Sequence, residues 1–114
     1  MAVVGPIEQI LLPVRDIGAA RRFYGGVLKL AAIADGEDLA IYDTGQAKLI
    51  LFRSDAPATG IELAFTVASL EAALAELVAA DVRIVSPPRT EPWGGRTAKI
   101  ADPDGHVHSL VQYP

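Results

Sequence analysis

The sequence predicts an α+β fold made of two βαβββ modules that follow each other along the chain. Strand-like and helix-like segments recur in the same order in both halves, and a shift of 53 residues lays Val14 on Val67 and Asp16 on Ser69. The length of 114 residues suits one domain. We therefore expect a single domain, 1–114, with a first module at about 5–53, a connector at 54–60 and a second module at about 61–114.

The first module is predicted to contain a strand, a helix and three further strands. The segment Ile7–Val14 is apolar except for two residues, which is typical of a strand. Asp16 then suits the N-cap of a helix that runs from Ile17 to about Leu28, because apolar residues recur on one face and Gly25-Gly26 weakens its end. Glycine-containing turns should separate the three strands Leu30–Ala34, Asp38–Asp43 and Ala47–Phe52.

The second module repeats this order. A strand over Ile61–Val67 precedes a helix capped by Ser69, and a short strand, Val82–Val85, follows it. The segment Ser86–Gly95 carries three prolines and two glycines, so we expect it to be the longest stretch without regular structure. Two strands joined by the turn Asp102-Pro103-Asp104-Gly105 complete the module: Thr97–Ala101 and Val107–Gln112.

Side chains alternate along a strand, so the first strand of each module should present two different faces. The residues expected to face the helices are Ile10, Leu12, Val14, Leu63, Phe65 and Val67. Gln9 and Glu62 fall at equivalent places and should lie on the opposite face, together with Leu11, Ala64 and Thr66. A polar pair on that face suggests a functional site.

Composition excludes several classes of function. Ten basic and fourteen acidic residues give a net charge of −4, so we expect no nucleic-acid partner. No apolar run reaches the ~18 residues of a membrane span, so we expect no membrane partner. The N-terminus lacks the basic start of a signal peptide and the chain has no cysteine, which favours a cytoplasmic location. No nucleophile elbow occurs, so serine-triad chemistry is not expected. No glycine-rich phosphate loop occurs either, so a nucleotide cofactor is not expected.

Four segments together resemble the vicinal oxygen chelate superfamily, which contains glyoxalases, bleomycin resistance proteins and extradiol (ring-cleaving) dioxygenases. They are Gln9–Asp16 leading to Phe23-Tyr24, Ile61–Ser69, Trp93–Arg96 and Asp102–His106. The resemblance covers nearly the whole chain and is closest in appearance to small, bacterial bleomycin-resistance-like members. It implies that the sheets curl into a cup with the helices on the outer face. It also implies a homodimer, with modules paired within one chain or between two.

The resemblance further implies four positions that hold a divalent metal ion in metal-dependent members: Gln9, Ile50, Glu62 and Ser109. Glutamine and glutamate oxygens suit a hard cation, whereas isoleucine offers no donor and a serine hydroxyl is a weak ligand. His106 and His108 have the opposite strand parity from Ser109, so we expect them on the helix side. We therefore expect no cofactor; if a metal ion binds, Gln9 and Glu62 are its ligands.

The candidate ligand-binding residues are Gln9, Leu11, Tyr42, Ile50, Phe52, Glu62, Trp93, Arg96 and Ser109. Three aromatic side chains among them could form the walls of a pocket, and Arg96 could bind a carboxylate or carbonyl oxygen. Glu62 is the candidate catalytic residue, because burial against apolar surfaces would raise its pKa toward that of a general base. Glu62 could equally be a solvated carboxylate at a pocket mouth, whereas an arginine such as Arg96 is more often a solvated loop residue. His108 is better explained as a core histidine than as a catalytic one.

Three functions remain open. The first is metal-free binding of a small aromatic or amphipathic molecule, as in antibiotic sequestration, with the acidic surface favouring cationic ligands. The alternative is a metal-dependent lyase, isomerase or dioxygenase acting on a substrate with vicinal oxygens, in which the metal is a Lewis acid and Glu62 a ligand or base. The third is a structural or partner-binding module with no ligand pocket.

Overall fold

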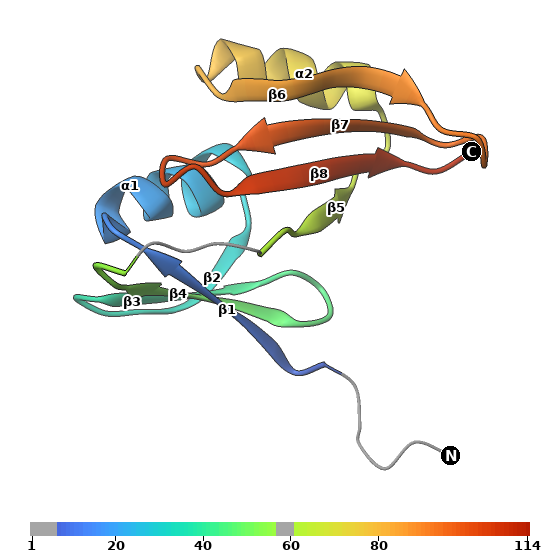
Figure 1. The fold of residues 1–114 in the computed structure, drawn as a ribbon. Coiled ribbons are helices and arrows are strands. Elements are labelled where there is room, and N and C mark those ends of the chain that lie inside the picture. The colour runs from blue at the N-terminus through green and yellow to red at the C-terminus, as the bar shows by residue number, and fades with distance from the viewer. Residues whose placement is uncertain (1–6, 57–60) are drawn as a thin grey trace, which may run out of the picture. The chain divides into compact units, whose positions relative to one another are not determined.

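The computed structural model describes residues 7–56 and 61–114, and the chain divides into two compact units, Met1–Ala58 and Thr59–Pro114. Each unit contains a four-stranded mixed sheet and helical structure, in the order βαβββ (Figure 1). The predicted α+β class and the two modules are confirmed. No helix within the described ranges is long and apolar enough to cross a membrane.

The first unit has the strand order β1-β4-β3-β2, in which β1 runs parallel to β4 and the other pairs are antiparallel. Its strands lie within one or two residues of their predicted bounds. The elements are β1 (Gln9–Val14), α1 (Ile17–Arg21), η1 (Arg22–Val27), β2 (Ala31–Asp35), β3 (Leu39–Asp43) and β4 (Lys48–Arg53).

The single helix expected from Ile17 to about Leu28 is instead an α-helix, α1, that continues as the π-helical turn η1. The Asp16 carboxylate accepts a hydrogen bond from the Ala19 N–H at 3.0 Å, which confirms the predicted N-cap. At the other end, the Leu28 N–H donates to the Phe23 carbonyl, five residues back, at 2.8 Å. Such wide turns insert one residue into the helix, and here the glycine pair predicted to weaken the end lies within η1.

The second unit has the order β5-β8-β7-β6, which repeats the first. Its elements are β5 (Ala64–Thr66), α2 (Leu70–Ala79), β6 (Arg83–Thr90), β7 (Arg96–Ala101) and β8 (Val107–Gln112). The start of α2 has two polar partners: the Ser69 hydroxyl accepts from the Ala72 N–H at 3.2 Å, and the Gln112 side chain accepts from the Leu70 N–H at 2.7 Å. The predicted cap is confirmed, and β8 supplies a second acceptor for the helix.

The prediction that Ser86–Gly95 lacks regular structure was wrong over its first half. Strand β6 extends to Thr90 and includes Pro87 and Pro88. A proline cannot donate to a sheet ladder, but β6 is the edge strand of its sheet and its register with β7 shifts between Ser86 and Arg89. Pro87 and Pro88 thus fall where the pairing with β7 is interrupted, and pairing resumes at Arg89.

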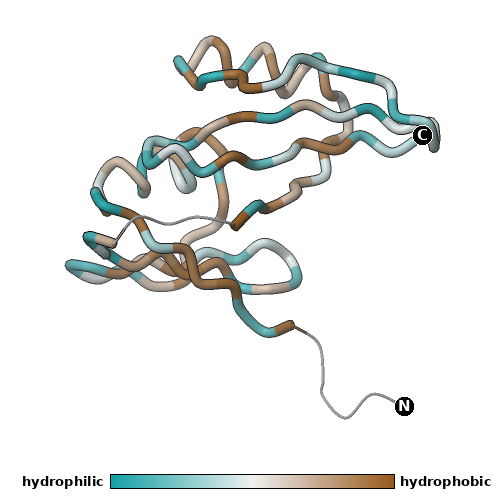
Figure 2. The backbone as a smooth tube through the Cα atoms, viewed as in Figure 1, coloured by the Kyte–Doolittle hydropathy of each residue, from teal (hydrophilic) through white to brown (hydrophobic). Residues whose placement is uncertain are grey.

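Each unit has its own core between the sheet and its helix. Hydrophobic residues run along the strands of both sheets (Figure 2), and alternate residues of these strands are buried. The buried side chains of the first unit are Leu12, Val14, Ala20, Phe23, Tyr24, Ala40, Tyr42, Leu49 and Leu51. Those of the second include Leu70, Leu77, Ala98, Ile100, His108 and Leu110.

Candidate functional site

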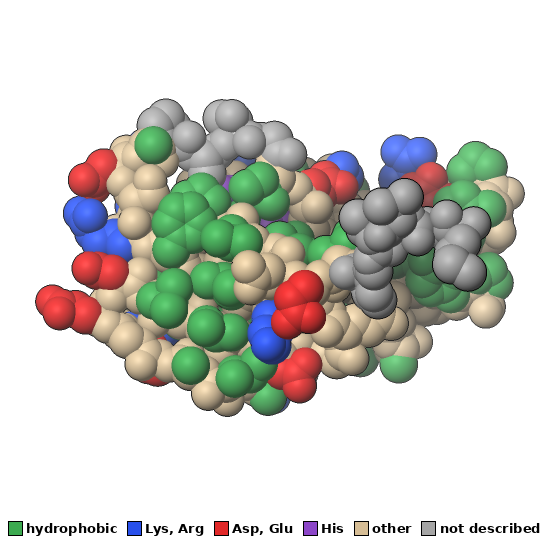
Figure 3. Space-filling model, turned by 90° about the horizontal axis from the view of Figure 1, so that it is seen from below, with side chains coloured by type: hydrophobic (Ala, Val, Ile, Leu, Met, Phe, Trp, Pro, Cys, Tyr) green, Lys and Arg blue, Asp and Glu red, His purple; other side chains and the backbone are tan. Residues whose placement is uncertain are grey.

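Most of the candidate residues lie on the distal face of a sheet, by which we mean the face turned away from the helix of the same unit. In the first unit, two rows of three registered residues cross β1, β4 and β3: Leu11–Ile50–Ile41 and Pro13–Phe52–Leu39. These six side chains are all apolar, and each is at least partly exposed. Leu11 is half-exposed, at 50% of its accessible surface. Figure 3 shows this region from below as a surface on which hydrophobic side chains gather.

A polar row lies next to the two apolar rows. Gln9, Lys48 and Asp43 are registered across the same three strands, and the Lys48 ammonium contacts a carboxylate oxygen of Glu8 at 3.1 Å. The structure thus brings four of the predicted ligand-binding residues to one face: Gln9, Leu11, Ile50 and Phe52. This face of the first unit combines an apolar surface with hydrogen-bonding groups at one end.

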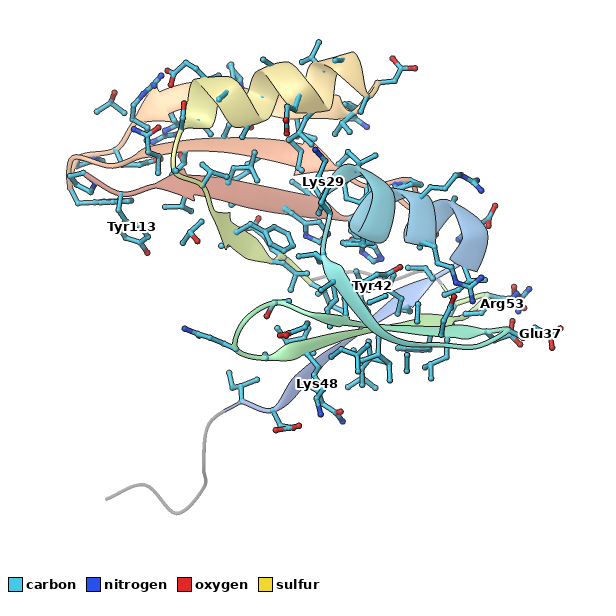
Figure 4. All side chains as sticks on the ribbon, turned by 180° about the vertical axis from the view of Figure 1, so that it is seen from behind. Lys29, Glu37, Tyr42, Lys48, Arg53 and Tyr113 are labelled. Atoms are coloured by element: carbon cyan, nitrogen blue, oxygen red, sulfur yellow. The ribbon has the colours of Figure 1, made fainter. Side chains whose placement is uncertain are left out.

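Tyr42, which is also predicted to bind the ligand, does not lie on this face. It pairs with the buried Leu49 and is itself buried on the helix side, whereas Lys48 projects from the other side of the sheet (Figure 4). A Cβ added at Gly25 would lie 3.1 Å from the Tyr42 ring and hydroxyl, so the glycine makes room for the phenol. Burial raises the pKa of Tyr42, and the nearby Asp35 carboxylate raises it further.

The distal face of the second unit is polar at the equivalent places. Ala64, Ser109 and Lys99 are registered across β5, β8 and β7, where the first unit has Leu11, Ile50 and Ile41. The Lys99 ammonium lies 3.0 Å from Glu62 Oε1, and the Ser109 hydroxyl donates to Glu62 Oε2 at 3.2 Å. We call these three residues, Glu62, Lys99 and Ser109, the Glu62 cluster.

The electrostatics of the Glu62 cluster favour a charged carboxylate. The hydrogen bond from Lys99 lowers the pKa of Glu62, and this effect outweighs the small desolvation that raises it. The Ser109 hydroxyl lowers the pKa of the same carboxyl further. The expectation that burial would raise the Glu62 pKa toward that of a general base was therefore wrong.

Sequence reasoning did not identify Lys99 as a site residue. A signal was available, because Lys99 is a charged residue between Ala98 and Ile100 in a strand whose other central residues are apolar. Its partner could not be inferred, since that requires the register of β7 on β8. The structure thus adds Lys99 to the predicted Glu62 and Ser109.

Arg96 and Trp93 lie outside the Glu62 cluster. Arg96 forms an ion pair with Glu71 of α2, which puts its guanidinium on the helix side of the sheet. Trp93 is 52% exposed in the turn between β6 and β7, and its ring centre lies 5.5 Å from that of Tyr113. A Cβ added at Gly95 would overlap the Trp93 ring, so the indole occupies the space beside that glycine. Among the described residues, neither Arg96 nor Trp93 forms a hydrogen bond or ion pair with the Glu62 cluster.

His108 is a core residue, as predicted. It is fully buried on the helix side of β8, and its Nδ1 accepts a hydrogen bond from the Leu63 N–H at 3.1 Å. Its ring meets that of Phe65 edge-on and stacks on that of His106, with ring centres 6.0 and 6.2 Å away. Burial lowers the pKa of His108, so the imidazole remains neutral and can keep accepting from Leu63.

The four positions implied for a metal ion do not make a good donor set. Ile50 supplies no donor atom, and the Glu62 carboxylate already binds the Lys99 ammonium. Gln9 lies on the first unit, beside Lys48, and the Ser109 hydroxyl donates to Glu62. Within residues 7–56 and 61–114, no group of three or more histidine, aspartate, glutamate or cysteine side chains could hold a metal ion.

Comparison with known proteins relates this fold to one family. The sequence profile of the glyoxalase/bleomycin resistance protein/dioxygenase superfamily matches residues 6–110. No curated protein matches the sequence. Among solved structures, a glyoxalase-related enzyme from Fulvimarina pelagi is 23% identical, with a TM-score of 0.84 over 97% of this chain and 90% of that one.

Two other solved structures show the same fold. A superfamily member from Sphaerobacter thermophilus is 21% identical, covers 98% of this chain and 100% of its own, and has a TM-score of 0.83. A lactoylglutathione lyase from Agrobacterium tumefaciens is also 21% identical, with 96% and 94% covered and a TM-score of 0.79. Two findings support the same family: the repeated βαβββ topology, and the profile match over nearly the whole sequence. The chain belongs to the glyoxalase/bleomycin resistance protein/dioxygenase superfamily.

Proposed function

We propose that this protein binds a small aromatic or amphipathic organic molecule without a metal ion. The observation that carries this proposal is the distal face of the first unit. Two registered rows of apolar side chains lie there beside a row of polar ones. Contiguous exposed apolar surface on a small protein is typical of a binding site.

The chemistry of this face suits an amphipathic ligand. Phe52 and the aliphatic side chains around it would bury the apolar part, at about 25 cal/mol for each Å² removed from water. The Gln9 amide and the Lys48 ammonium stand at the end of the apolar rows and could bind a polar group of the same molecule. Gln9 thereby takes the role of a hydrogen-bonding residue.

Metal-dependent catalysis by the same superfamily fold has less support. Such a reaction would need Glu62 as a metal ligand or as a base near neutral pH. The Lys99 ammonium pairs with that carboxylate and lowers its pKa, which weakens both roles. We therefore propose that the protein, as a cytoplasmic homodimer, sequesters an organic ligand rather than converting it.

The test is titration with the fluorescent amphiphile 1-anilinonaphthalene-8-sulfonate. Wild type should bind it with a Kd below about 1 mM, or roughly 4 kcal/mol. The variant Leu11→Gln loses apolar contact worth about 1 kcal/mol, so its Kd should rise about fivefold. Val78→Gln is the matched control, because Val78 is an exposed apolar residue on α2 of the other unit. Equal effects of the two substitutions, or no binding by wild type, would reject the proposed face.

Metal content gives a separate test of the metal-free part. The protein would be incubated with manganese, iron, cobalt, nickel and zinc salts, dialysed exhaustively and analysed for metal per chain. We expect less than about a tenth of an ion per chain, because a site with so few donors releases its ion on dialysis. About one ion per chain would overturn the proposal and turn the search to substrates with vicinal oxygens.

A further inference from the structure

We infer that the Lys99 ammonium takes the place of a metal ion in the Glu62 cluster and keeps divalent metal ions away from Glu62 and Ser109. The same ammonium can instead donate a hydrogen bond to an oxygen acceptor of a ligand. This inference concerns the second unit alone and goes beyond the proposed function, because it does not depend on what binds to the apolar face of the first unit.

The geometry of the cluster is that of a cation held by oxygens. Lys99 and Ser109 are directly registered on the neighbouring strands β7 and β8, so both side chains leave the sheet at the same level. The ammonium lies 3.0 Å from one carboxylate oxygen of Glu62, and the Ser109 hydroxyl binds the other oxygen at 3.2 Å. Both carboxylate oxygens are therefore engaged by groups of this chain.

A metal ion would have to displace this arrangement. The positive charge that a carboxylate attracts is already supplied at hydrogen-bond distance, and an approaching divalent ion meets a like charge there. The pKa of Glu62 is lowered chiefly by the hydrogen bond from Lys99, which shows that the ammonium already stabilises the carboxylate charge. The repeat supports a specific role as well: the equivalent positions of the first unit are Gln9, Ile41 and Ile50, which carry no charge.

The ammonium also determines what the cluster can bind. A lysine ammonium has three N–H donors and no acceptor. One donor is used on Glu62, and no contact with another described residue uses the remaining two. A carbonyl or carboxylate oxygen of a ligand could accept a charge-assisted hydrogen bond from either of these two N–H donors. The cluster should thus prefer an anionic or carbonyl-bearing ligand group, in contrast to the cationic ligands that the net charge of −4 favours over long distances.

The experiment uses Mn²⁺ as a paramagnetic probe in NMR spectra of the full-length, ¹⁵N-labelled chain. Three substitutions are compared with wild type: Lys99→Met, Lys99→Arg and Lys48→Met. Lys48 is a matched control, because its ammonium also contacts a glutamate, Glu8, at 3.1 Å and its side chain is 46% exposed, against 44% for Lys99. Lys99→Arg keeps a cation in place and controls for the loss of the lysine itself.

In wild type, Lys99→Arg and Lys48→Met, we expect Mn²⁺ to leave the amide signals of Ser109 and Ala64 as sharp as those elsewhere. In Lys99→Met the same signals should broaden selectively, at Mn²⁺ concentrations at least about tenfold below the highest one at which the wild-type signals stay sharp. Lys48→Met should instead broaden signals near Glu8. Equal broadening in wild type and Lys99→Met would overturn the inference, because the lysine then excludes nothing.

The absence of selective broadening in Lys99→Met, with its spectrum otherwise that of a folded chain, would overturn it as well, because the oxygens then do not attract a cation. A second arm titrates benzoate as the oxygen acceptor. Benzoate should shift the Lys99 and Ser109 amide signals of wild type, and these shifts should vanish in Lys99→Met. Unchanged shifts would reject the acceptor role. The Leu11→Gln titration reports on the first unit, so failure here and failure of the proposed function are distinguishable.

Discussion

His108→Leu tests whether the buried histidine holds the start of the second module in place. Leucine has a similar apolar volume but no acceptor, so the Leu63 N–H that now donates to Nδ1 at 3.1 Å would lose its partner. A partly buried donor left without an acceptor costs about 1–3 kcal/mol. Leucine is more apolar than histidine, which offsets only part of this cost at a fully buried position. We expect the free energy of unfolding to fall by about 1–3 kcal/mol.

The measurement is urea unfolding followed by far-UV circular dichroism and by the fluorescence of Trp93, which lies in the same unit as His108. His108→Asn is the control, since an amide oxygen on a short side chain can still accept from Leu63. It should be less destabilised than His108→Leu. A loss below about 0.5 kcal/mol in His108→Leu would show that the hydrogen bond does not stabilise the fold.

The same substitution predicts a pH dependence. Burial lowers the pKa of His108 below the ordinary histidine value of 6.5, so the unfolded chain binds the proton more readily than the folded one. The stabilisation from neutral His108 is therefore complete above about pH 6.5 and is lost as the pH falls toward the folded-state pKa. The difference between wild type and His108→Leu should shrink between about pH 7.5 and about pH 5. A difference that stays constant would refute this assignment.

Three further predictions concern the second unit. Asp102→Ala removes the carboxylate that accepts two backbone N–H groups of the following turn, at 2.9 and 2.8 Å, and should lower the free energy of unfolding by about 1–3 kcal/mol; an unchanged urea midpoint would contradict it. Gln112→Ala removes the acceptor for the Leu70 N–H and should lower the free energy of unfolding by about 1 kcal/mol, with an early loss of helical circular dichroism signal on heating. An unchanged melting curve would argue that water replaces the side chain as the acceptor. Lys99→Met should raise the pKa of Glu62 toward 4.5, as measured by ¹³C NMR of the carboxyl group, and a pKa that stays low would assign the effect to other groups.

The fold was largely predictable because local patterns determine it. Alternation in β1 placed Gln9 and Leu11 on the face away from the helix, and the caps at Asp16 and Ser69 were identified from side-chain chemistry alone. The 53-residue repeat then gave the second module the same order as the first. The error at β6 arose because proline content argues against a strand only where both neighbours need its N–H group, and the sequence does not say which strand is at an edge.

The candidate site was less predictable, because it depends on register between strands. Tyr42 and Phe52 are both aromatic residues in predicted strands, yet they face opposite sides of the same sheet. Parity within one strand cannot relate β3 to β4 until the pairing is known. The contact between Lys99 and Glu62 joins residues 37 positions apart, and its effect on the Glu62 pKa reverses the direction expected from burial.

The prolines of β6 also affect how this protein behaves at high concentration. An edge strand with regularly spaced N–H groups is a template on which another chain can add a strand, and this is a common first step in aggregation. In the second sheet one edge is β6, whose Pro87 and Pro88 lack N–H groups and whose register is broken, and the other edge is β5, with only three residues. Neither edge offers a long run of donors to a neighbour. The residues that made this segment hard to assign as a strand therefore protect the sheet from growing beyond its four strands.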